Sequence, residues 1–419
     1  MIRKKAGRGR DLPASESGGS RSGYNPAMRR HWTLDPDVVF VNHGSYGACP
    51  RVVLDAAARF RADLEREPVR FFERFLESEL DGARIEVARF VGARPEQLAF
   101  VPNATSAVSA VLRSLDLGPG DALLTTDHAY GACRNALELV ARRASVEIVT
   151  ASVPFPVQGP GEVVERVLAS VTPRVKLALI DHVTSPTGLV FPIDVIVREL
   201  RERGIETLVD GAHAPGMLPL DLDALGAAYY TGNFHKWVCA PKSAAMLVVR
   251  EDLQASIHPA VISHGLSSRR PRARFLEEFD WTGTLDPSAW LAVPEAIRFV
   301  GSLAPGGWNE VYARNRALAL EARRLLAEAL SVKPPAPESM LASLVALPVP
   351  DGPGPAPITH GEEPLHRVLF DRHRIEVPVL PWPAWPRRLL RISAHLYNER
   401  GDYEQLAAAL TRELDLRAA

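Results

Sequence analysis

Short apolar runs alternate with amphipathic stretches along the middle of the chain, from about residue 84 to 250. Apolar runs of this kind predict strands, and stretches with helical spacing of their apolar positions predict helices. We expect strands at 97–101, 122–126, 147–151, 176–183, 206–210, 227–231 and 246–250, and helices at 105–115, 133–144, 161–171 and 194–204. Uninterrupted apolar strands that alternate with helices predict an α/β fold, with a mostly parallel seven-stranded sheet covered by helices on both faces.

The pattern changes after about residue 305. A long helix is expected at 308–330, a strand at 343–349, a helix at 364–375 and a final helix from about 401. We therefore divide the chain into four parts. They are a disordered basic tail (1–34), an N-terminal segment packing on the small domain (35–83), a large cofactor-binding domain (84–300) and a small C-terminal α+β domain (301–419).

Composition narrows the class of protein. The chain is 46% hydrophobic and 24% charged with a formal net charge of -1, which is typical of a soluble globular protein and gives no field that would attract nucleic acid. Its three cysteines form no CxxC pair, so we expect neither a disulfide framework nor a zinc site. No apolar run is long enough to span a membrane, and the basic start lacks the apolar centre of a signal peptide, so we expect a cytoplasmic protein.

Polar residues follow the predicted strands at the edge where ligands gather in parallel sheets. These residues are Asn103 to Ser106, Asp127 to Tyr130, Thr184 to Gly188, Asp210 to His213, and Asn233 to Lys236. Lys236 stands in the apolar stretch "AAYYTGNFHKWVCAPKSAAML", either as a lysine whose stem covers apolar surface or as a reactive amine. Asp210 ends a buried strand, where a carboxylate is costly unless a cation meets it.

One ligand requires this set of groups. Pyridoxal 5′-phosphate (PLP) needs an amine for its aldehyde, an acid beside its pyridine nitrogen, N–H donors for its phosphate and a flat partner for its ring. The common nucleotide-binding glycine motifs are absent from the sequence.

Several motifs carry a family resemblance. The stretches "DGAHAPG" (210–216) and "TGNFHKW" (231–237) resemble the fold type I PLP enzymes of the class V aminotransferase superfamily. Further stretches resemble one branch of this superfamily, the isopenicillin N epimerase-like branch. They are "VNHGSYGACP", "EPVRFFERF", "NATSA", "DHAYGA", "TSPTG", "WTGTLD" and "RISAHLYN". This branch includes epimerases and relatives of hercynylcysteine sulfoxide lyases. The resemblance runs from about residue 35 to the end, and implies an aspartate aminotransferase-like fold.

The resemblance also implies roles for single residues. Lys236 would form the Schiff base and then remove the Cα proton, and Asp210 would pair with the pyridine nitrogen. His213 would bond the phenolic oxygen, with Ser185 as a second partner, and either His128 or Tyr130 would stack on the ring. The phosphate would be held by Ala104, Thr105, Asn233 and His235, and by Thr284 of a second copy, which implies a homodimer with shared active sites.

The substrate side of the site is less determined. Arg391 would grip a substrate carboxylate, although a surface salt bridge is the alternative. Asn42 and His43 would face the substrate entrance or form a turn and a cap, and Arg70 is open to the same two interpretations.

The reaction divides after proton removal. Epimerisation is favoured, with Tyr130 as the second acid; a C–S or β-elimination lyase is the alternative, and an aminotransferase comes third. A non-catalytic sensor of PLP or an amino acid is a remote alternative, because residues 1–40 are too short for a DNA-binding domain. Persulfide transfer is disfavoured because no cysteine follows Cys239.

Overall fold

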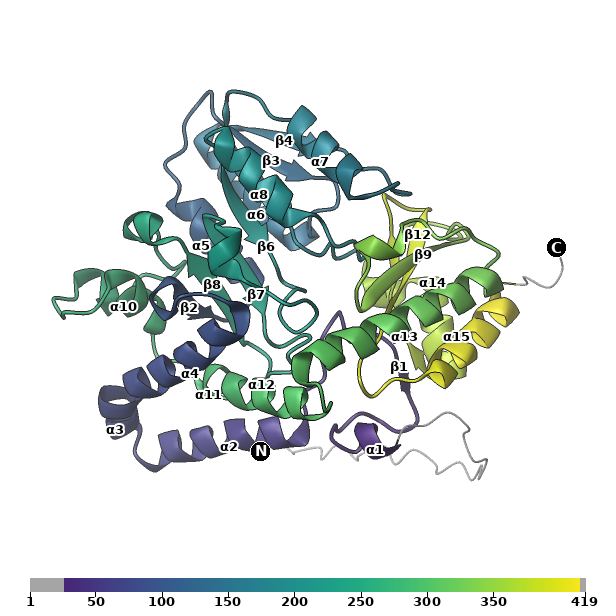
Figure 1. Cartoon of the computed structure of the whole chain (residues 1–419), viewed down its shortest axis with the longest axis horizontal. Helices are drawn as coiled ribbons and strands as arrows, with labels where there is room; N and C mark the ends of the chain where they lie inside the picture. Colours follow the sequence, from purple (N-terminus) through teal and green to yellow (C-terminus); the bar gives the residue numbers. More distant parts are fainter. Residues whose placement is uncertain (1–25, 415–419) are drawn as a thin grey trace, which may run out of the picture.

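A seven-stranded sheet forms the centre of the larger part of the molecule, in a computed structural model that describes residues 26–414 (Figure 1). The strands lie in the order β2-β8-β7-β6-β5-β3-β4. Their bounds are β2 (Leu98–Val101), β3 (Ala122–Thr126), β4 (Glu147–Ala151), β5 (Val175–Asp181), β6 (Glu206–Asp210), β7 (Tyr229–Asn233) and β8 (Ala245–Val249). β8 is antiparallel to both neighbours and the other pairs are parallel. The predicted α/β fold with a mostly parallel sheet is confirmed.

Helices cover both faces of this sheet, as α5 (Ala104–Ser114), α6 (Gly131–Ala144), α7 (Pro160–Ala169), α8 (Ile193–Glu202) and the short α9 (Leu222–Leu225). Successive strand residues point to opposite faces. Leu123 lies in one apolar cluster with residues of α5 and α6, and Leu124 lies in the other with residues of α7 and α8. Since both faces are buried, the strands are apolar at nearly every position.

The segment before the sheet contacts both ends of the molecule. β1 (Val39–Phe40) pairs in parallel with β10 (Ile375–Glu376) of the small domain. By contrast, α2 (Arg51–Arg66) and α4 (Leu76–Val91), joined by α3 (Pro68–Arg70), lie against α11 (Ser288–Leu291) and α12 (Val293–Ser302). Upstream lie the short helix α1 (Pro26–Arg29) and Trp32, whose side chain is buried in an apolar cluster. Residues 26–34, assigned above to a disordered tail, are therefore folded. The rest of that predicted tail, residues 1–25, lies outside the described residues.

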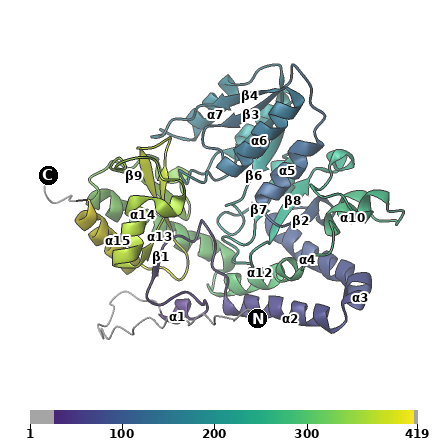
Figure 2. The same ribbon diagram turned by 180° about the vertical axis from the view of Figure 1, so that it is seen from behind.

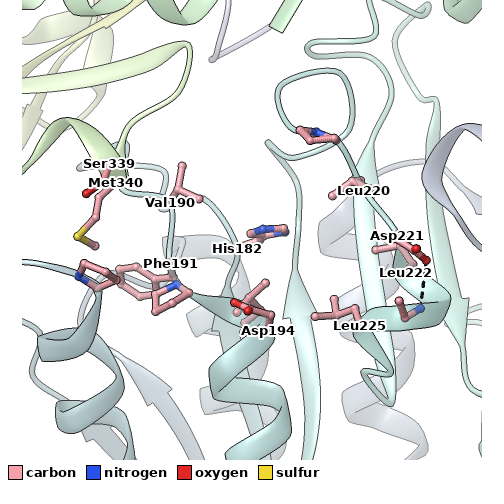
Figure 3. Close-up of a pocket in the computed structure, with 15 residues that line it drawn as sticks. His182, Val190, Phe191, Asp194, Leu220, Asp221, Leu222, Leu225, Ser339 and Met340 are labelled. Atoms are coloured by element: carbon pink, nitrogen blue, oxygen red, sulfur yellow. Dashed lines mark hydrogen bonds between the residues drawn. The ribbon is translucent and has the colours of Figure 1, made fainter. Parts of the chain in front are cut away.

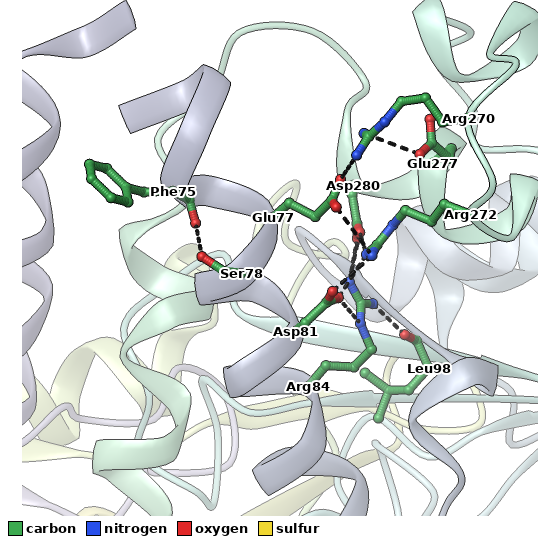
Figure 4. Close-up of polar contacts among 10 residues, drawn as sticks. All are labelled: Phe75, Glu77, Ser78, Asp81, Arg84, Leu98, Arg270, Arg272, Glu277 and Asp280. Atoms are coloured by element: carbon green, nitrogen blue, oxygen red, sulfur yellow. Dashed lines mark hydrogen bonds and ion pairs between the residues drawn. The ribbon is translucent and has the colours of Figure 1, made fainter. Parts of the chain in front are cut away.

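Ion pairs fix α4 to α10 (Arg274–Asp280) and to the loop before it (Figure 4). Arg84 is 2% exposed and donates to both carboxylate oxygens of Asp280, at 2.8 and 2.7 Å, and to the carbonyl of Leu98 at 2.6 Å. Arg272 pairs with Asp280 and Asp81. A buried guanidinium needs such partners, so the network secures α4 against the edge of the sheet.

The small domain lies at the other end of the molecule (Figure 2). Its antiparallel sheet has the order β11-β12-β9, with β9 (Leu344–Val349), β11 (Val379–Pro381) and β12 (Arg388–Ser393). Its helices are α13 (Gly307–Ala329), α14 (Pro364–His373) and α15 (Arg400–Glu413). Short 3₁₀ turns lie at Pro95–Gln97, Glu251–Ser256, His264–Ser267, Glu338–Met340 and His360–Glu362, and a π-helical turn lies at Phe71–Phe75. The domain boundaries at residues 84 and 300 stay a prediction.

None of the helices in the described part combines the length and apolarity that crossing a membrane requires.

Candidate active site

Lys236 lies in a cavity of about 380 Å³ at the carboxyl edge of the large sheet. The chain reaches it directly after β7, whose last residue is Asn233. The small domain closes the other side, because Leu380, Pro381 and Arg391 come from β11 and β12. The remaining wall consists of Gly44, Ser45, Tyr46, Ala129, Tyr130, Gly131, Ala132, Ser185 and Pro186.

The surroundings of Lys236 favour a neutral amine. Burial and then the nearby Arg391 guanidinium lower its pKa from 10.5 to about 7, while the Asp210 carboxylate opposes this shift. Both main causes penalise the ammonium form. Lys236 is therefore suited to accept a proton or to attack a carbonyl near neutral pH.

His213 is held in one tautomer beside this amine. The Trp237 indole N–H donates to His213 Nδ1 at 3.3 Å, so the proton of the neutral ring lies on Nε2. His213 Nε2 is 3.0 Å from Lys236 Nζ. Burial, followed by the charges of Lys236 and Arg391, lowers the pKa of His213 well below its ordinary value. His213 thus presents a neutral Nε2–H to the amine of Lys236.

Asp210 supplies a buried carboxylate behind the lysine. Its side chain is 2% exposed, and Oδ1 accepts the N–H of Ala212 at 3.0 Å. Asp181 is its partner in the register of β5 and β6. Burial and then the charge of Asp210 raise the pKa of Asp181 well above its ordinary value, so Asp181 favours its protonated form.

Arg391 is a buried cation without a carboxylate partner among the described residues. It is 4% exposed, and its terminal nitrogens donate to Ser185 (carbonyl 2.7 Å, Oγ 3.1 Å) and to Ser45 Oγ at 2.7 Å. Its Nε has no hydrogen-bond partner within the described chain. Burial lowers its pKa to about 10. An exposed salt bridge is thereby contradicted, and the guanidinium is left for an anion in the cavity.

Tyr130 and His128 were both candidates for the ring-stacking position, and the structure separates them. Tyr130 lines the cavity, and burial raises the pKa of its hydroxyl. His128 is fully buried away from the cavity, with Nδ1 2.8 Å from Thr187 Oγ1 and Nε2 2.9 Å from the carbonyl of Val153. Because His128 is fully buried and is not among the residues that line the cavity, its assignment to the ring-stacking position is not supported.

Three of the predicted phosphate contacts, Ala104, Thr105 and Asn233, lie together at the first turn of α5. The Ala104 N–H, predicted to hold the phosphate, donates to Asn233 Oδ1 at 2.9 Å and is therefore already engaged within the chain. The N–H of Thr105 has no partner within the helix, as is usual in a first turn. His235 Nδ1 is buried and has no partner among the described residues, and burial lowers the pKa of His235 to about 4. Thr105 and His235 therefore remain available for an anion.

Four other predicted residues lie outside the cavity of their own chain. Asn42 donates to Glu376 Oε1 at 2.9 Å and thus links β1 to β10, which corrects its placement at the entrance. Arg70 is exposed and lies over the ring of Phe75, and Thr284 is exposed in the loop before α11. His43 is described next.

His43 supports the backbone of the lysine instead of lining the entrance. Its Nε2 is 3.0 Å from the carbonyl of Lys236, which can only accept, so Nε2 carries the proton. Its Nδ1 then accepts from Tyr397 at 2.6 Å. Gly47 lies on the same backbone, since a Cβ there would meet the Lys236 carbonyl at 2.4 Å. Tyr397 and Gly47 belong to motifs noted in the sequence, but only the fold shows that Gly47 lies against Lys236 and that Tyr397 supports it through His43.

Ser45 and Tyr46 are cavity residues that sequence reasoning missed. Ser45 contacts Arg391, and Tyr46 is 76% exposed at the rim. The stretch "VNHGSYGACP" had been recognised, yet neither residue was chosen, because the side that a loop residue faces is not encoded in its spacing.

A second cavity, of about 500 Å³, is lined by residues of α8, of α9 and of the loops beside them, and holds none of the predicted site residues (Figure 3). His182 stands in it with Nδ1 2.8 Å from the Tyr230 hydroxyl. The backbone N–H of His182 donates to the carbonyl of Asp210 at 2.9 Å, so this region supports the strand end that carries Asp210.

The fold and the cavity together define a lysine-centred α/β enzyme site at the strand ends of a mostly parallel sheet. Residues 45–354 match the Aminotransferase class-V family. The chain is 39% identical over 397 residues to isopenicillin N epimerase of Amycolatopsis lactamdurans, covering 91% of this chain and 96% of that protein. It is 30% identical over 397 residues to a probable chloroplastic L-cysteine desulfhydrase of Arabidopsis thaliana, covering 90% and 83%. The chain therefore belongs to the Aminotransferase class-V family.

Solved structures share the fold. A C-DES variant with glycine covalently linked to its PLP cofactor superposes with a TM-score of 0.79 at 22% identity, covering 91% of this chain and 98% of that one. The predicted family, the enzyme class and the PLP cofactor are confirmed.

Proposed function

We propose that this chain is a PLP-dependent epimerase, which inverts Cα of an amino acid or of a small peptide-like amine. The observation that carries the proposal is the content of one cavity. It holds an amine with a pKa of about 7 (Lys236), a buried guanidinium without a carboxylate partner in the described chain (Arg391), and a tyrosine that keeps its proton (Tyr130). The relative that is 39% identical and carries the name isopenicillin N epimerase supports this choice.

The residues present fit the cofactor. Lys236 offers the amine that an aldehyde requires, and Asp210 offers a carboxylate for a protonated ring nitrogen. His213 presents Nε2–H beside the lysine. The unpartnered Nδ1 of His235 and the first-turn N–H of Thr105 suit a phosphate. When bound, PLP withdraws electrons from the substrate and so makes its Cα proton acidic.

The chain's own groups would position the substrate and move the proton. Arg391 would bind the substrate carboxylate through a two-pronged hydrogen bond, which fixes the orientation of Cα in the cavity. Lys236 would take the proton from Cα, because its pKa lies near neutral pH. Tyr130 would deliver a proton from the other side, since burial keeps its hydroxyl protonated.

A C–S or β-elimination lyase is the second candidate, supported by the relative named as an L-cysteine desulfhydrase. In that case Tyr130 would protonate the leaving sulfur. An aminotransferase is the third candidate. Persulfide transfer finds no support, because Cys49, Cys133 and Cys239 are the chain's only cysteines and all are buried.

We also propose a cytoplasmic homodimer with shared active sites. Thr284 is exposed and absent from the cavity of its own chain, which is consistent with a contact made to the phosphate in a second copy.

Incubation with candidate amino acids in deuterated water tests the reaction. An epimerase gives inverted product with deuterium at Cα and needs no keto acid. Pyruvate with ammonia would indicate the lyase, and dependence on a keto acid would indicate the aminotransferase. Wild-type protein that carries out neither exchange nor turnover on any of them would contradict the proposal.

A further inference from the structure

The thiol of Cys133 lies against the carboxylate of Asp210. Cys133 is the third residue of α6 and is 1% exposed, and its Sγ is 3.1 Å from Asp210 Oδ2. The other carboxylate oxygen, Oδ1, accepts a backbone N–H from Ala212. Within the described chain, Cys133 is thus the side chain that hydrogen-bonds Asp210.

The contact can only be a hydrogen bond from a protonated thiol. Burial, and then the charge of Asp210, raise the pKa of Cys133 far above its ordinary value. The thiol therefore keeps its proton and is a donor, not a nucleophile. The hydroxyl of Thr105 is a second neighbour of the sulfur, so the thiol lies between the first turn of α5 and the end of β6.

The orientation of the Asp210 carboxylate depends on such donors. Its neighbour Asp181 offers no cation to pair with it, and its own strand ends at this residue. With Oδ1 held by Ala212, a donor at Oδ2 fixes the plane of the carboxylate. An S–H group is a weak donor, so it orients the carboxylate while leaving most of its basicity for a cationic partner.

We propose that Cys133 is a positioning residue, which holds Asp210 in the orientation that a protonated ring nitrogen requires. This inference rests on the proposed function of Asp210 toward PLP. Cys133 itself takes no part in proton transfer. A serine at this position would keep the donor, whereas an alanine would leave Oδ2 without one.

The contact is tested first in cofactor-free protein by infrared spectroscopy. The difference spectrum between wild type and Cys133→Ala isolates the S–H stretching band of this thiol. Asp210→Asn should shift that band, because an amide replaces the charged acceptor. A band that does not move in Asp210→Asn would overturn the proposal, whatever the wild-type protein binds.

The role is tested in the loaded protein with Cys133→Ala, Cys133→Ser and the matched control Cys49→Ala, which shortens another buried cysteine. We expect Cys133→Ala to weaken PLP binding about tenfold, in line with the loss of a hydrogen bond to a charged group. It should also shift the pH at which the visible absorbance of the bound cofactor changes. Cys133→Ser should restore both, and Cys49→Ala should change neither.

Equal PLP affinity and an unchanged absorbance titration in Cys133→Ala would overturn the role of Cys133. Wild-type protein that binds no PLP would instead contradict the proposed function. If Cys133→Ala does not fold, the infrared band in wild type and Asp210→Asn still decides the contact.

Discussion

Replacement of Lys236 by methionine should stabilise the cofactor-free protein in a pH-dependent way. Methionine keeps an unbranched chain of similar length and removes the amine. Burial and the Arg391 charge lower the pKa of Lys236 from 10.5 to about 7, so between these values the unfolded chain binds a proton that the folded chain does not. Wild-type stability therefore rises with pH through this window.

The size of the effect follows from the same shift. One pH unit across the window corresponds to about 1.4 kcal/mol. Between about pH 7 and about pH 9.5, the free energy of unfolding of the wild type should therefore rise by about 3 kcal/mol relative to that of Lys236→Met. Methionine should give the more stable protein at neutral pH, and the difference should narrow as pH rises.

Urea unfolding followed by circular dichroism at the two pH values measures this difference. Lys333→Met, at an exposed position, controls for the loss of an ordinary ammonium. A difference between wild type and Lys236→Met that stays constant with pH would refute the reasoning. So would a variant that is less stable at neutral pH, since that result would mean a charged and well-paired lysine.

Three further substitutions test the site and the fold. Arg391→Lys replaces a forked donor by a point charge and should raise KM for carboxylate substrates about 10- to 100-fold; an unchanged KM in steady-state assays would remove Arg391 from the substrate site. Tyr130→Phe should retain Cα deuterium exchange by NMR but slow inversion about 100-fold or more, and equal rates of inversion would exclude Tyr130 as the second acid. Glu363→Gln leaves the buried Arg388 without its carboxylate partner and should cost about 3–5 kcal/mol in urea unfolding; a loss below about 1 kcal/mol would contradict a buried ion pair there.

The strands and helices of the large domain could be predicted because each is apolar at intervals set by its own geometry. The predicted helix 105–115 is α5 (104–114), and the predicted strand 206–210 is β6. The strand order could not be predicted in the same way. That β2 pairs with β8, far along the chain, depends on tertiary packing and leaves no local signal.

The site shows the same limit. Lys236, Tyr130 and Ser185 were expected at strand ends and Arg391 within a strand of the small domain, and the four share one cavity. His128, an alternative to Tyr130 for the stacking position, lies outside this cavity, because the pattern locates a residue in a loop without saying which way its ring turns. The contact between Cys133 and Asp210 joins α6 to β6 and exists only in the folded chain.

The most direct test of the account is where the cofactor attaches. The purified protein should be yellow with PLP, and borohydride reduction followed by proteolysis and mass spectrometry should find the pyridoxyl group on the peptide that contains Lys236. A pyridoxyl label on another lysine, or no label on protein saturated with PLP, would contradict the assignment of the site.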